Sequence, residues 1–325
     1  MDVVDGHSHL FQNFASSDHL KRSVKEVEGF DMRRLLKLPD EAGVSQVQVE
    51  PQEMTRVMGQ WLGSNELTAD VQRSAPDRIV GYAAAEPLDP QGGFNRARLE
   101  EVREMITVRG LKGLLLTPPY GHYYSNDKRV YPFYEMATEL GVPIYFHHSH
   151  MFMPPKLCPL KYARIWHLDD LTIDFPDLRF NVEHMGYPWT EELLSIMARS
   201  PNVYSDTAEY VTPDPTYPNR PLLLARNLGM AREYGVLDRI FYGSDYVGEN
   251  IDEYVRLLKY EIRWIKESLN VHMEKLGFPP LSQEEMEGLL GKNVRALWKG
   301  RQSNVPTWAL METYARSDSC HQRTD

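Results

Sequence analysis

The sequence places histidines at intervals that suit the coordination of a metal ion. His7 and His9 are separated by one residue, and His147, His184 and Asp245 follow at wider intervals. Residues i and i+2 of a strand project to the same face, so His7 and His9 can reach one ion from a single strand. Neutral imidazole nitrogens suit zinc and other borderline divalent ions. A further imidazole and one carboxylate would complete such a site and leave a position open for water or substrate.

Short apolar runs alternate with longer amphipathic segments along most of the chain. The strand candidates are 3–9, 45–51, 79–87, 111–119, 143–148, 179–186, 203–208 and 239–246, and the helix candidates between them are 31–43, 94–108, 131–140, 163–175, 190–199 and 221–234. Strands that alternate with helices indicate a parallel sheet. Eight such units predict an α/β fold of the (β/α)8 type, a TIM barrel, rather than an open doubly wound sheet.

The barrel pattern ends before the chain does. Two more helix candidates, 251–272 and 284–298, follow the eighth strand and are expected to pack outside the barrel. We therefore expect one domain over residues 1–300. The polar segment 301–325 is expected to form a C-terminal tail or an arm onto a partner subunit.

The composition argues against several classes of protein. The chain has 325 residues, of which 42% are hydrophobic, and its formal net charge of -10 argues against a nucleic-acid or anionic-membrane partner. Its two cysteines, Cys158 and Cys320, lie far apart, which predicts no disulfide framework and a reducing compartment. The sequence shows neither a signal segment nor an apolar run of about 18 residues, so we expect a cytoplasmic protein without a membrane-spanning helix.

The candidate metal-binding residues stand where a barrel has its active site. In a (β/α)8 barrel that site lies at the carboxyl ends of the strands. His7 and His9 end the first strand candidate, His147 the fifth, His184 the sixth and Asp245 the eighth. A single His-x-His pair is a weak signal, but this order of residues is specific. Structural zinc sites are usually closed and rich in cysteine, so the pattern favours an enzyme.

Several short segments resemble the amidohydrolase superfamily. They are 5–9 (DGHSH), 141–147 (GVPIYFH), 183–186 (EHMG), 243–246 (GSDY), and 291–293 (GKN) with 296–297 (AL). They look most like the branch that contains aminocarboxymuconate-semialdehyde decarboxylase and the resorcylate-type decarboxylases. The likeness covers about residues 3–299, and the segments are specific jointly rather than singly.

Carried over to this chain, the resemblance implies a site for one divalent metal ion, zinc or manganese. The implied ligands are His7, His9, His147 and Asp245. It implies His184 as a substrate-binding or proton-transferring group beside the metal. The choice of His147 over His148 rests on the family pattern. Two-metal members carry a lysine at the end of strand four, whereas this chain has 116–119 (LTPP) there. The resemblance also implies a homodimer.

The resemblance favours non-oxidative decarboxylation of an aromatic or conjugated unsaturated carboxylic acid. The metal would act as a Lewis acid on the carboxylate and an adjacent oxygen, and Asp245 or a water beside it, assisted by His184, would handle the proton. Hydrolysis of an amide, lactone or similar bond is the alternative, in which Asp245 takes a proton from water and His184 stabilises the oxyanion. Hydration of an unsaturated diacid would use the same residues. The ligands alone do not separate these reactions.

Residues that contact a small-molecule carboxylate substrate are expected in the loops after the strands. The candidates are His122, His150 and Glu209. Each has an alternative structural interpretation, as a packing residue, a loop histidine or a helix cap. For Glu50, Glu86 and Asp206, too, the sequence leaves open whether the side chain lines the cavity or caps a helix. His148 is expected to pack on the face opposite to His147. No arginine stands at a strand end, so Arg56 and Arg220 are weak candidates for the carboxylate anchor.

Overall fold

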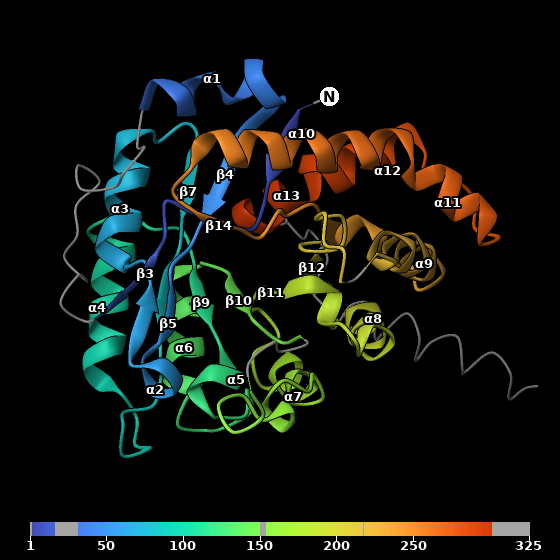
Figure 1. Ribbon diagram of the computed structural model, residues 1–325. Helices are drawn as coiled ribbons and strands as arrows, with labels where there is room; N and C mark the ends of the chain where they lie inside the picture. Colours follow the sequence, from blue (N-terminus) through green and yellow to red (C-terminus); the bar gives the residue numbers. More distant parts are fainter. Residues whose placement is uncertain (1, 17–31, 150–153, 217, 301–325) are drawn as a thin grey trace, which may run out of the picture.

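Figure 1 shows the computed structural model, in which parallel strands form a ring that helices surround on the outside. The structure describes residues 2–16, 32–149, 154–216 and 218–300. The ring strands are β1 (Val3–Asp5), β4 (Val44–Val49), β7 (Ile79–Gly81), β8 (Ala83–Ala85), β9 (Leu114–Leu116), β10 (Ile144–Phe146), β11 (Phe180–Val182), β12 (Val203–Asp206) and β13 (Ile240–Phe241). β7 and β8 are two parts of one run that is interrupted only at Tyr82.

Backbone pairing continues around the whole ring. β1, β4 and β7 pair in parallel, and β8 to β13 pair in parallel in chain order. The remaining gap is bridged by the Gly6 amide, which donates a hydrogen bond to the Tyr242 carbonyl (3.0 Å). Beyond this bond, β2 (Ser8–Leu10) pairs in parallel with β14 (Tyr246–Gly248). The predicted (β/α)8 barrel is therefore confirmed.

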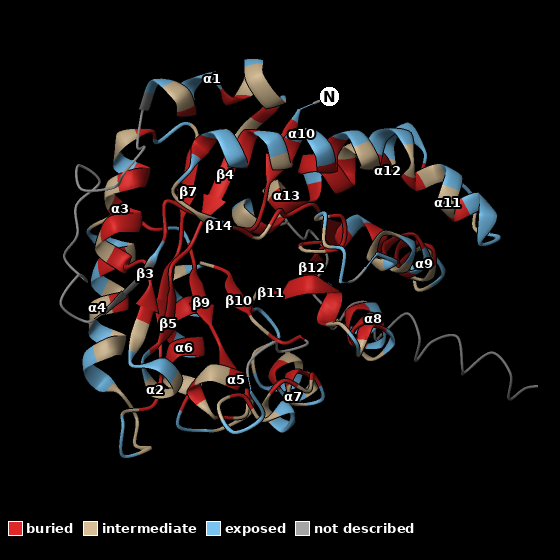
Figure 2. Ribbon diagram, in the orientation of Figure 1, coloured by how far each residue is buried: buried red, intermediate tan, exposed pale blue. Residues whose placement is uncertain are grey.

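The strands bury both of their faces. The cluster inside the ring contains Val4, Tyr82, Leu115, Tyr145, Tyr204 and Phe241, with Val294 and Leu297 from the C-terminal helix. Alternate positions, such as Val3, Leu114 and Ile144, belong to the larger cluster between the ring and the helices. Figure 2 shows most of the strand residues buried and the helices buried on their inward sides. Parity along a strand thus decides which side chains face the barrel interior.

Helices connect the successive strands and cover the ring. They are α1 (Met32–Ala42), α2 (Thr55–Met58), α3 (Asn65–Ser74), α4 (Arg96–Thr107), α5 (Pro118–Gly121), α6 (Tyr131–Leu140), α7 (His167–Asp174), α8 (Thr190–Arg199) and α9 (Arg220–Glu233). Each helix predicted from the sequence before residue 235 overlaps one of them. The sequence did not predict α3, although Ser64 marks its start, where the serine hydroxyl accepts a hydrogen bond from the Leu67 amide (3.1 Å).

Three other parts of the chain differ from the expectation. The helix predicted over 251–272 is two helices, α10 (Ile251–Glu267) and α11 (Leu269–Lys275), which meet at Ser268. The helix predicted over 284–298 is α12 (Gln283–Glu287), a π-helical turn (Gly288–Lys292) and α13 (Asn293–Lys299). An unexpected antiparallel sheet consists of β3 (Phe14–Ser16), β6 (Gln60–Leu62) and β5 (Gln52–Met54). Its strands are three residues long, too short to show an alternating pattern.

Some expectations concern residues outside those that the structure describes. They are the C-terminal tail 301–325, His150 and Cys320. Cys158 is a buried free cysteine. Among the described residues, no helix combines the length and the apolar character that are needed to cross a membrane.

Glu261 on α10 gives a pH-dependent contribution to stability that can be tested. Its buried carboxyl accepts hydrogen bonds from the hydroxyls of Tyr242 (2.7 Å) and Thr212 (2.8 Å). Burial, only partly offset by these bonds, raises the pKa of Glu261 to about 8. The unfolded carboxyl loses its proton near its ordinary pKa of about 4.5, so stability falls as the pH rises from that value to about 8.

We therefore compare the free energy of unfolding of Glu261→Gln with that of the natural chain at pH 5 and at pH 9. The difference should change by roughly 2–4 kcal/mol in favour of the variant when the pH rises from 5 to 9. Urea denaturation of both proteins at the two pH values measures this change. Glu253→Gln, an exposed position on the same helix, is the control and is expected to show no such trend. A stability difference for Glu261→Gln that is the same at both pH values would contradict the assignment.

Candidate metal centre

A layer of polar side chains lies beyond the apolar layer inside the ring. Because side chains alternate along a strand, the second residue after an interior apolar one also faces inward. His147 follows Tyr145 in this way, Asp206 follows Tyr204, and Asp245 comes four residues after Phe241. Glu50 and Glu183 occupy the corresponding ends of the second and sixth strands, and both are buried. Titratable groups from the first, second, fifth, sixth, seventh and eighth strands thus meet at one rim.

Four imidazoles of this rim share one arrangement of their ring nitrogens. Each places Nδ1 beside an oxygen: His7 at 3.2 Å from Asp206 Oδ2, His9 at 2.8 Å from the Glu50 carbonyl, His147 at 2.6 Å from Glu183 Oε2 and His184 at 3.3 Å from the Ala208 carbonyl. Histidines that bind metals characteristically hold one ring nitrogen in this way. Nε2 is then the nitrogen that each ring presents to a ligand.

The Asp245 carboxylate joins the two histidines of strand one. Its Oδ1 lies 3.4 Å from His7 Nε2 and 3.5 Å from His9 Nε2. Two donor atoms bound at about 2.1 Å in a tetrahedral zinc site are separated by about 3.4 Å. His7, His9 and Asp245 therefore come together with the spacing that a shared ion requires.

Glu50 supplies a further donor at the same point. Its Oε1 lies 3.5 Å from His7 Nε2, and its Oε2 accepts a hydrogen bond from Gln48 Nε2 (3.0 Å). Glu50 Oε1 and both ring nitrogens of His7 are buried and make no hydrogen bond with the described residues. A buried polar atom without a partner costs about 1–3 kcal/mol, which coordination to a cation would offset. The donor set therefore fits a divalent metal ion.

His184 and His147 extend the site along the rim. The ring centroids of His7 and His184 are 5.2 Å apart, and so are those of His184 and His147. Donor atoms within 4.8 Å of one another group His184 with His7 and Asp245, and group His147 with Glu183 and His184. The structure thus brings together three of the four predicted ligands, and it places His147 beside Glu183 and His184.

His148 lies on the opposite face of the strand, as expected. It is buried, with Nε2 at 2.6 Å from the Ser125 hydroxyl and Nδ1 at 3.0 Å from the Ala163 carbonyl. Both ring nitrogens therefore have partners outside the barrel interior. Burial lowers the pKa of His148 to about 3, so the ring is a neutral packing residue.

The charges at the rim favour bound positive charge. Burial alone would lower the pKa of His7, but Asp206 and two further carboxylates raise it well above its usual value. Burial alone would raise the pKa of Asp206, but His7 and hydrogen bonds lower it to about 2. Burial raises the pKa of Glu50 and of Asp245 well above the usual range, with His7 opposing it and nearby carboxylates adding to it. Crowded, buried carboxylates of this kind are the environment that a divalent cation stabilises.

Three residues of the rim adopt left-handed backbone conformations. The φ angle is 55° at His184, 64° at Glu209 and 53° at Asp245. Such angles are uncommon for residues other than glycine and concentrate at functional sites. At His184 the turn directs the backbone amide to Asp206 Oδ1 (3.0 Å). The sixth strand, predicted to reach residue 186, therefore ends at Val182.

Close packing holds the segment before Asp245 against strand one. A Cβ atom at Gly243 would lie 2.6 Å from the Cβ of His7, so this approach requires glycine. The buried Asp5 carboxylate accepts hydrogen bonds from the Ser244 amide (2.9 Å) and hydroxyl (2.6 Å) and from the Tyr254 hydroxyl (2.7 Å). These contacts fix the residue that follows, Asp245, beside the histidines.

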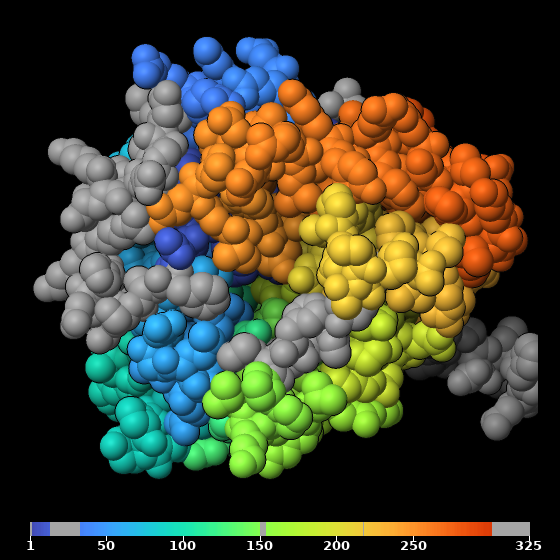
Figure 3. Space-filling view, in the orientation of Figure 1, coloured from blue at the N-terminus to red at the C-terminus, as the bar shows by residue number. Residues whose placement is uncertain are grey.

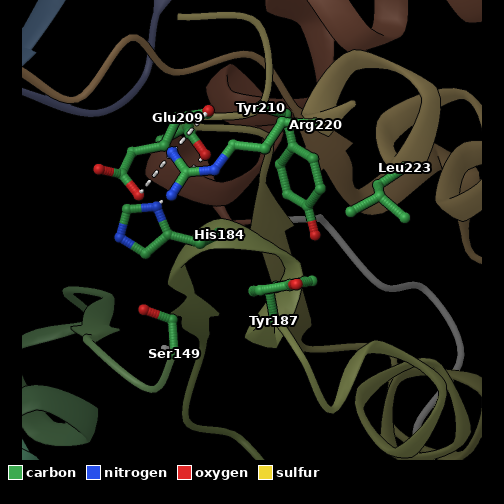
Figure 4. A pocket seen from close by; sticks show the side chains of 8 residues that line it. Ser149, His184, Tyr187, Glu209, Tyr210, Arg220 and Leu223 are labelled. Carbon is green, nitrogen blue, oxygen red and sulfur yellow. Dashed lines mark hydrogen bonds and ion pairs between the residues drawn. The ribbon is translucent and has the colours of Figure 1, made fainter. Parts of the chain in front are cut away.

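A pocket opens beside His184, and Figure 4 shows the side chains around it. Its lining residues are Ser149, His184, Tyr187, Ala208, Glu209, Tyr210, Arg220 and Leu223. In the space-filling view of Figure 3, this face of the molecule is hollowed between α10 and the segment before α9 on one side and α7 on the other. Glu209 lines the pocket, as a substrate-binding residue would. His122 instead has Nε2 at 2.5 Å from the Leu157 carbonyl and stacks on Tyr162.

Three carboxylates of the rim carry more of the site than the sequence indicates. For Glu50 and Asp206 the sequence left open whether they line the cavity or cap a helix, and Glu183 stood only within the segment 183–186. Strand parity was the signal that could have placed all three inside the barrel. The ring of Tyr120, which stacks on His147 with centroids 5.4 Å apart, lies in a connection where no such signal exists.

Comparison with protein families gives a match over most of the chain. A family model described as amidohydrolase matches residues 4–300. No curated protein sequence matches the chain.

Several solved structures share the fold. A dihydroxybenzoic acid decarboxylase from Polaromonas with bound manganese has a TM-score of 0.58 at 17% identity, covering 93% of this chain and 98% of its own. A 4-oxalomesaconate hydratase from Rhodopseudomonas palustris has a TM-score of 0.56 at 16% identity, and the match covers 98% of this chain and 100% of the hydratase. A probable 2-pyrone-4,6-dicarboxylic acid hydrolase from Acinetobacter baumannii has a TM-score of 0.56 at 14% identity, with 92% and 100% covered. Identities this low show a common fold.

Proposed function

The chain belongs to the amidohydrolase family of enzymes, and from this premise we propose that it is a metal-dependent decarboxylase. Its substrate would be an aromatic or conjugated unsaturated carboxylic acid. The observation that supports this most is the convergence of His7, His9 and Asp245 at a rim where His184 also faces a pocket with tyrosine walls. His147 is proposed as the fourth ligand, held by Glu183.

The aromatic lining of the pocket suits a flat, unsaturated acid. The rings of Tyr187 and Tyr210 meet edge to face with centroids 6.3 Å apart, and both line the pocket beside His184. Aromatic side chains pack well against flat unsaturated ligands. His184 both lines the pocket and groups with His7 and Asp245, which supports its proposed role beside the reacting carbon of such an acid.

The proposed reaction needs one proton and releases carbon dioxide. A bound divalent ion would supply a Lewis acid for the carboxylate and an adjacent oxygen of the substrate. His184 would deliver a proton from Nε2 to the carbon that bears the carboxylate, and a water molecule beside Asp245 would return a proton from solvent to the His184 ring. The bond from that carbon to the carboxylate then breaks, its electron pair stays with the ring or chain, and carbon dioxide leaves.

A panel of substrates tests this proposal. The purified protein, loaded with manganese or zinc, would be incubated with 2,6-dihydroxybenzoate, 4-oxalomesaconate and 2-pyrone-4,6-dicarboxylate in heavy water. We expect release of carbon dioxide and one deuterium on the product carbon. The His7→Ala protein is the matched control and should release none.

The same panel detects the alternative reactions. A new carboxylate without carbon dioxide would identify a hydrolase, in which Asp245 takes the proton of a water. Loss of the conjugated chromophore with addition of water would identify a hydratase. Either result, with no carbon dioxide from any member of the panel, would replace the proposal.

A further inference from the structure

Glu50 is held through only one of its two carboxylate oxygens. It follows β4 directly, and its side chain is fully buried. Its Oε2 accepts a hydrogen bond from Gln48 Nε2 (3.0 Å), whereas its Oε1 lies 3.5 Å from His7 Nε2. Neither Oε1 nor that nitrogen makes a hydrogen bond with the described residues. The protein thus fixes one oxygen of Glu50 and leaves the other facing His7.

The separation of Glu50 and His7 suits a shared ion better than a hydrogen bond. A hydrogen bond between nitrogen and oxygen spans about 2.7–3.2 Å, which is less than the 3.5 Å observed. Asp245 Oδ1 lies at nearly the same distance from His7 Nε2, 3.4 Å. Donor atoms of His7, His9 and Glu50 lie within 4.8 Å of one another. Buried charge with this spacing is stabilised by a cation that lies between the donors.

Trp298 determines which end of the Gln48 amide meets Glu50. It lies on α13, which packs against the cluster inside the ring, and its Nε1 donates a hydrogen bond to Gln48 Oε1 (3.3 Å). An indole nitrogen can only donate, so the amide oxygen must face Trp298. The amide nitrogen then faces Glu50, and it too can only donate. Glu50 Oε2 is therefore the acceptor, and Oε1 is turned toward His7.

We propose that Glu50 is a direct ligand of the metal ion through Oε1, and that Gln48 and Trp298 are the positioning residues that orient it. The inference rests on the proposed function, because it takes a divalent ion to lie at the metal-binding rim. It adds a ligand that the family resemblance does not imply. Together with Asp245, Glu50 balances the two positive charges of the ion with two carboxylates. α13, near the end of the chain, thereby contributes to the strength of metal binding.

Two substitutions of Glu50 separate a ligand from a nearby charge. Glu50→Gln keeps the size of the side chain and removes its charge, whereas Glu50→Asp keeps the charge and draws the carboxylate back by one methylene group. Titration calorimetry of the chelator-treated proteins would give their affinities for manganese. Glu86→Gln is the matched control, because Glu86 is a buried carboxylate that ends the third strand and accepts a hydrogen bond from the Arg56 amide (2.8 Å).

We expect both Glu50 variants to bind manganese at least about 100-fold more weakly than the natural chain, because each loses a donor. Glu86→Gln should stay within about twofold of the natural chain, as a distant, independent site does. If Glu50→Asp binds manganese as tightly as the natural chain, Glu50 acts only as a nearby charge and the inference is overturned. Unchanged affinity in Glu50→Gln would overturn it as well.

Gln48→Met and Trp298→Phe test how Glu50 is oriented. Gln48→Met should weaken manganese binding by about 10–100-fold, as the loss of a group that orients a ligand does. Trp298→Phe should weaken it by about two- to tenfold, the worth of one hydrogen bond. Because Trp298 acts through Gln48, the double variant should bind no more weakly than Gln48→Met. Additive losses, or no loss in either single variant, would overturn the positioning role.

Trp264→Phe is the control for the loss of an indole nitrogen, because Trp264 lies on α10 and stacks on His272 outside the ring. It should leave the affinity for manganese unchanged. Circular dichroism would verify the fold of every variant. If Trp298→Phe does not fold, the comparison of Glu50→Asp with Glu50→Gln still decides whether Glu50 is a ligand.

Failure of the proposed function would look different from failure of this inference. A natural chain that binds manganese through Glu50 but releases no carbon dioxide would keep the ligand and lose the proposed reaction. A natural chain that releases carbon dioxide, with Glu50 variants that bind manganese normally, would keep the reaction and lose the ligand. A natural chain that binds neither manganese nor zinc would overturn both.

Discussion

Replacing His7 with alanine should remove both the bound metal and the turnover while the barrel stays folded. His7 is the most enclosed imidazole of the rim, and its Nε2 lies within 3.5 Å of carboxylate oxygens from both Asp245 and Glu50. Loss of a group that only orients a metal ligand costs about 10–100-fold in affinity or activity. Loss of the donor itself is expected to cost at least about 100-fold in both.

The measurement is metal content after dialysis, by atomic emission, together with the rate of carbon dioxide release. His272→Ala is the control for the loss of a histidine, because His272 lies on α11 outside the ring and stacks on Trp264. Circular dichroism would verify the fold of both proteins. If the His7→Ala protein keeps one metal ion per chain and a near-normal rate, His7 is not a metal ligand.

The barrel and much of its rim could be predicted from the sequence. Eight apolar runs in alternation with helices determine a parallel ring, and period-two alternation determines what faces its interior along most strands. The first strand is the exception, because His7 comes three residues after the inward-facing Val4 and lies beyond the end of β1. Tyr145 faces inward, so His147 does, and His148 turns outward to Ser125 and Ala163. These rules are local and can be read without coordinates. The close approach of Gly243 to His7, by contrast, appears only in the structure.

What the sequence could not supply depends on contacts between distant segments. Asp206 orients His7 from the seventh strand, and Glu183 holds His147 from the sixth. The spacing of these residues in the sequence predicts neither of the two pairs. The left-handed turns at His184 and Glu209 are set by surrounding hydrogen bonds, such as that from the His184 amide to Asp206. The homodimer stays a prediction, because the structure is of one chain.

His184→Asn should lower the rate of carbon dioxide release by about 10²–10⁴-fold, the usual contribution of a positioned acid or base, and leave the metal bound. Asparagine tolerates the left-handed backbone at this position, so the variant removes the imidazole with little strain. The imidazole is held by the Ala208 carbonyl at Nδ1, and its ring centroid lies 5.2 Å from those of both His7 and His147. Burial lowers the pKa of His184, so its ring is neutral before it takes up a proton.

The metal content of the variant then decides whether His147 or His184 is the fourth metal ligand. His184 groups with His7 and Asp245 within 4.8 Å, whereas His147 groups with Glu183 and His184. If His184 only moves the proton, His184→Asn keeps its ion and His147→Asn loses it. If His184→Asn loses the ion and His147→Asn keeps it, His184 is the fourth ligand and the proton must come from Asp245. The Glu183 carboxylate, 2.6 Å from His147 Nδ1, favours the first outcome, because a carboxylate behind the ring is the support that a metal-bound histidine characteristically has.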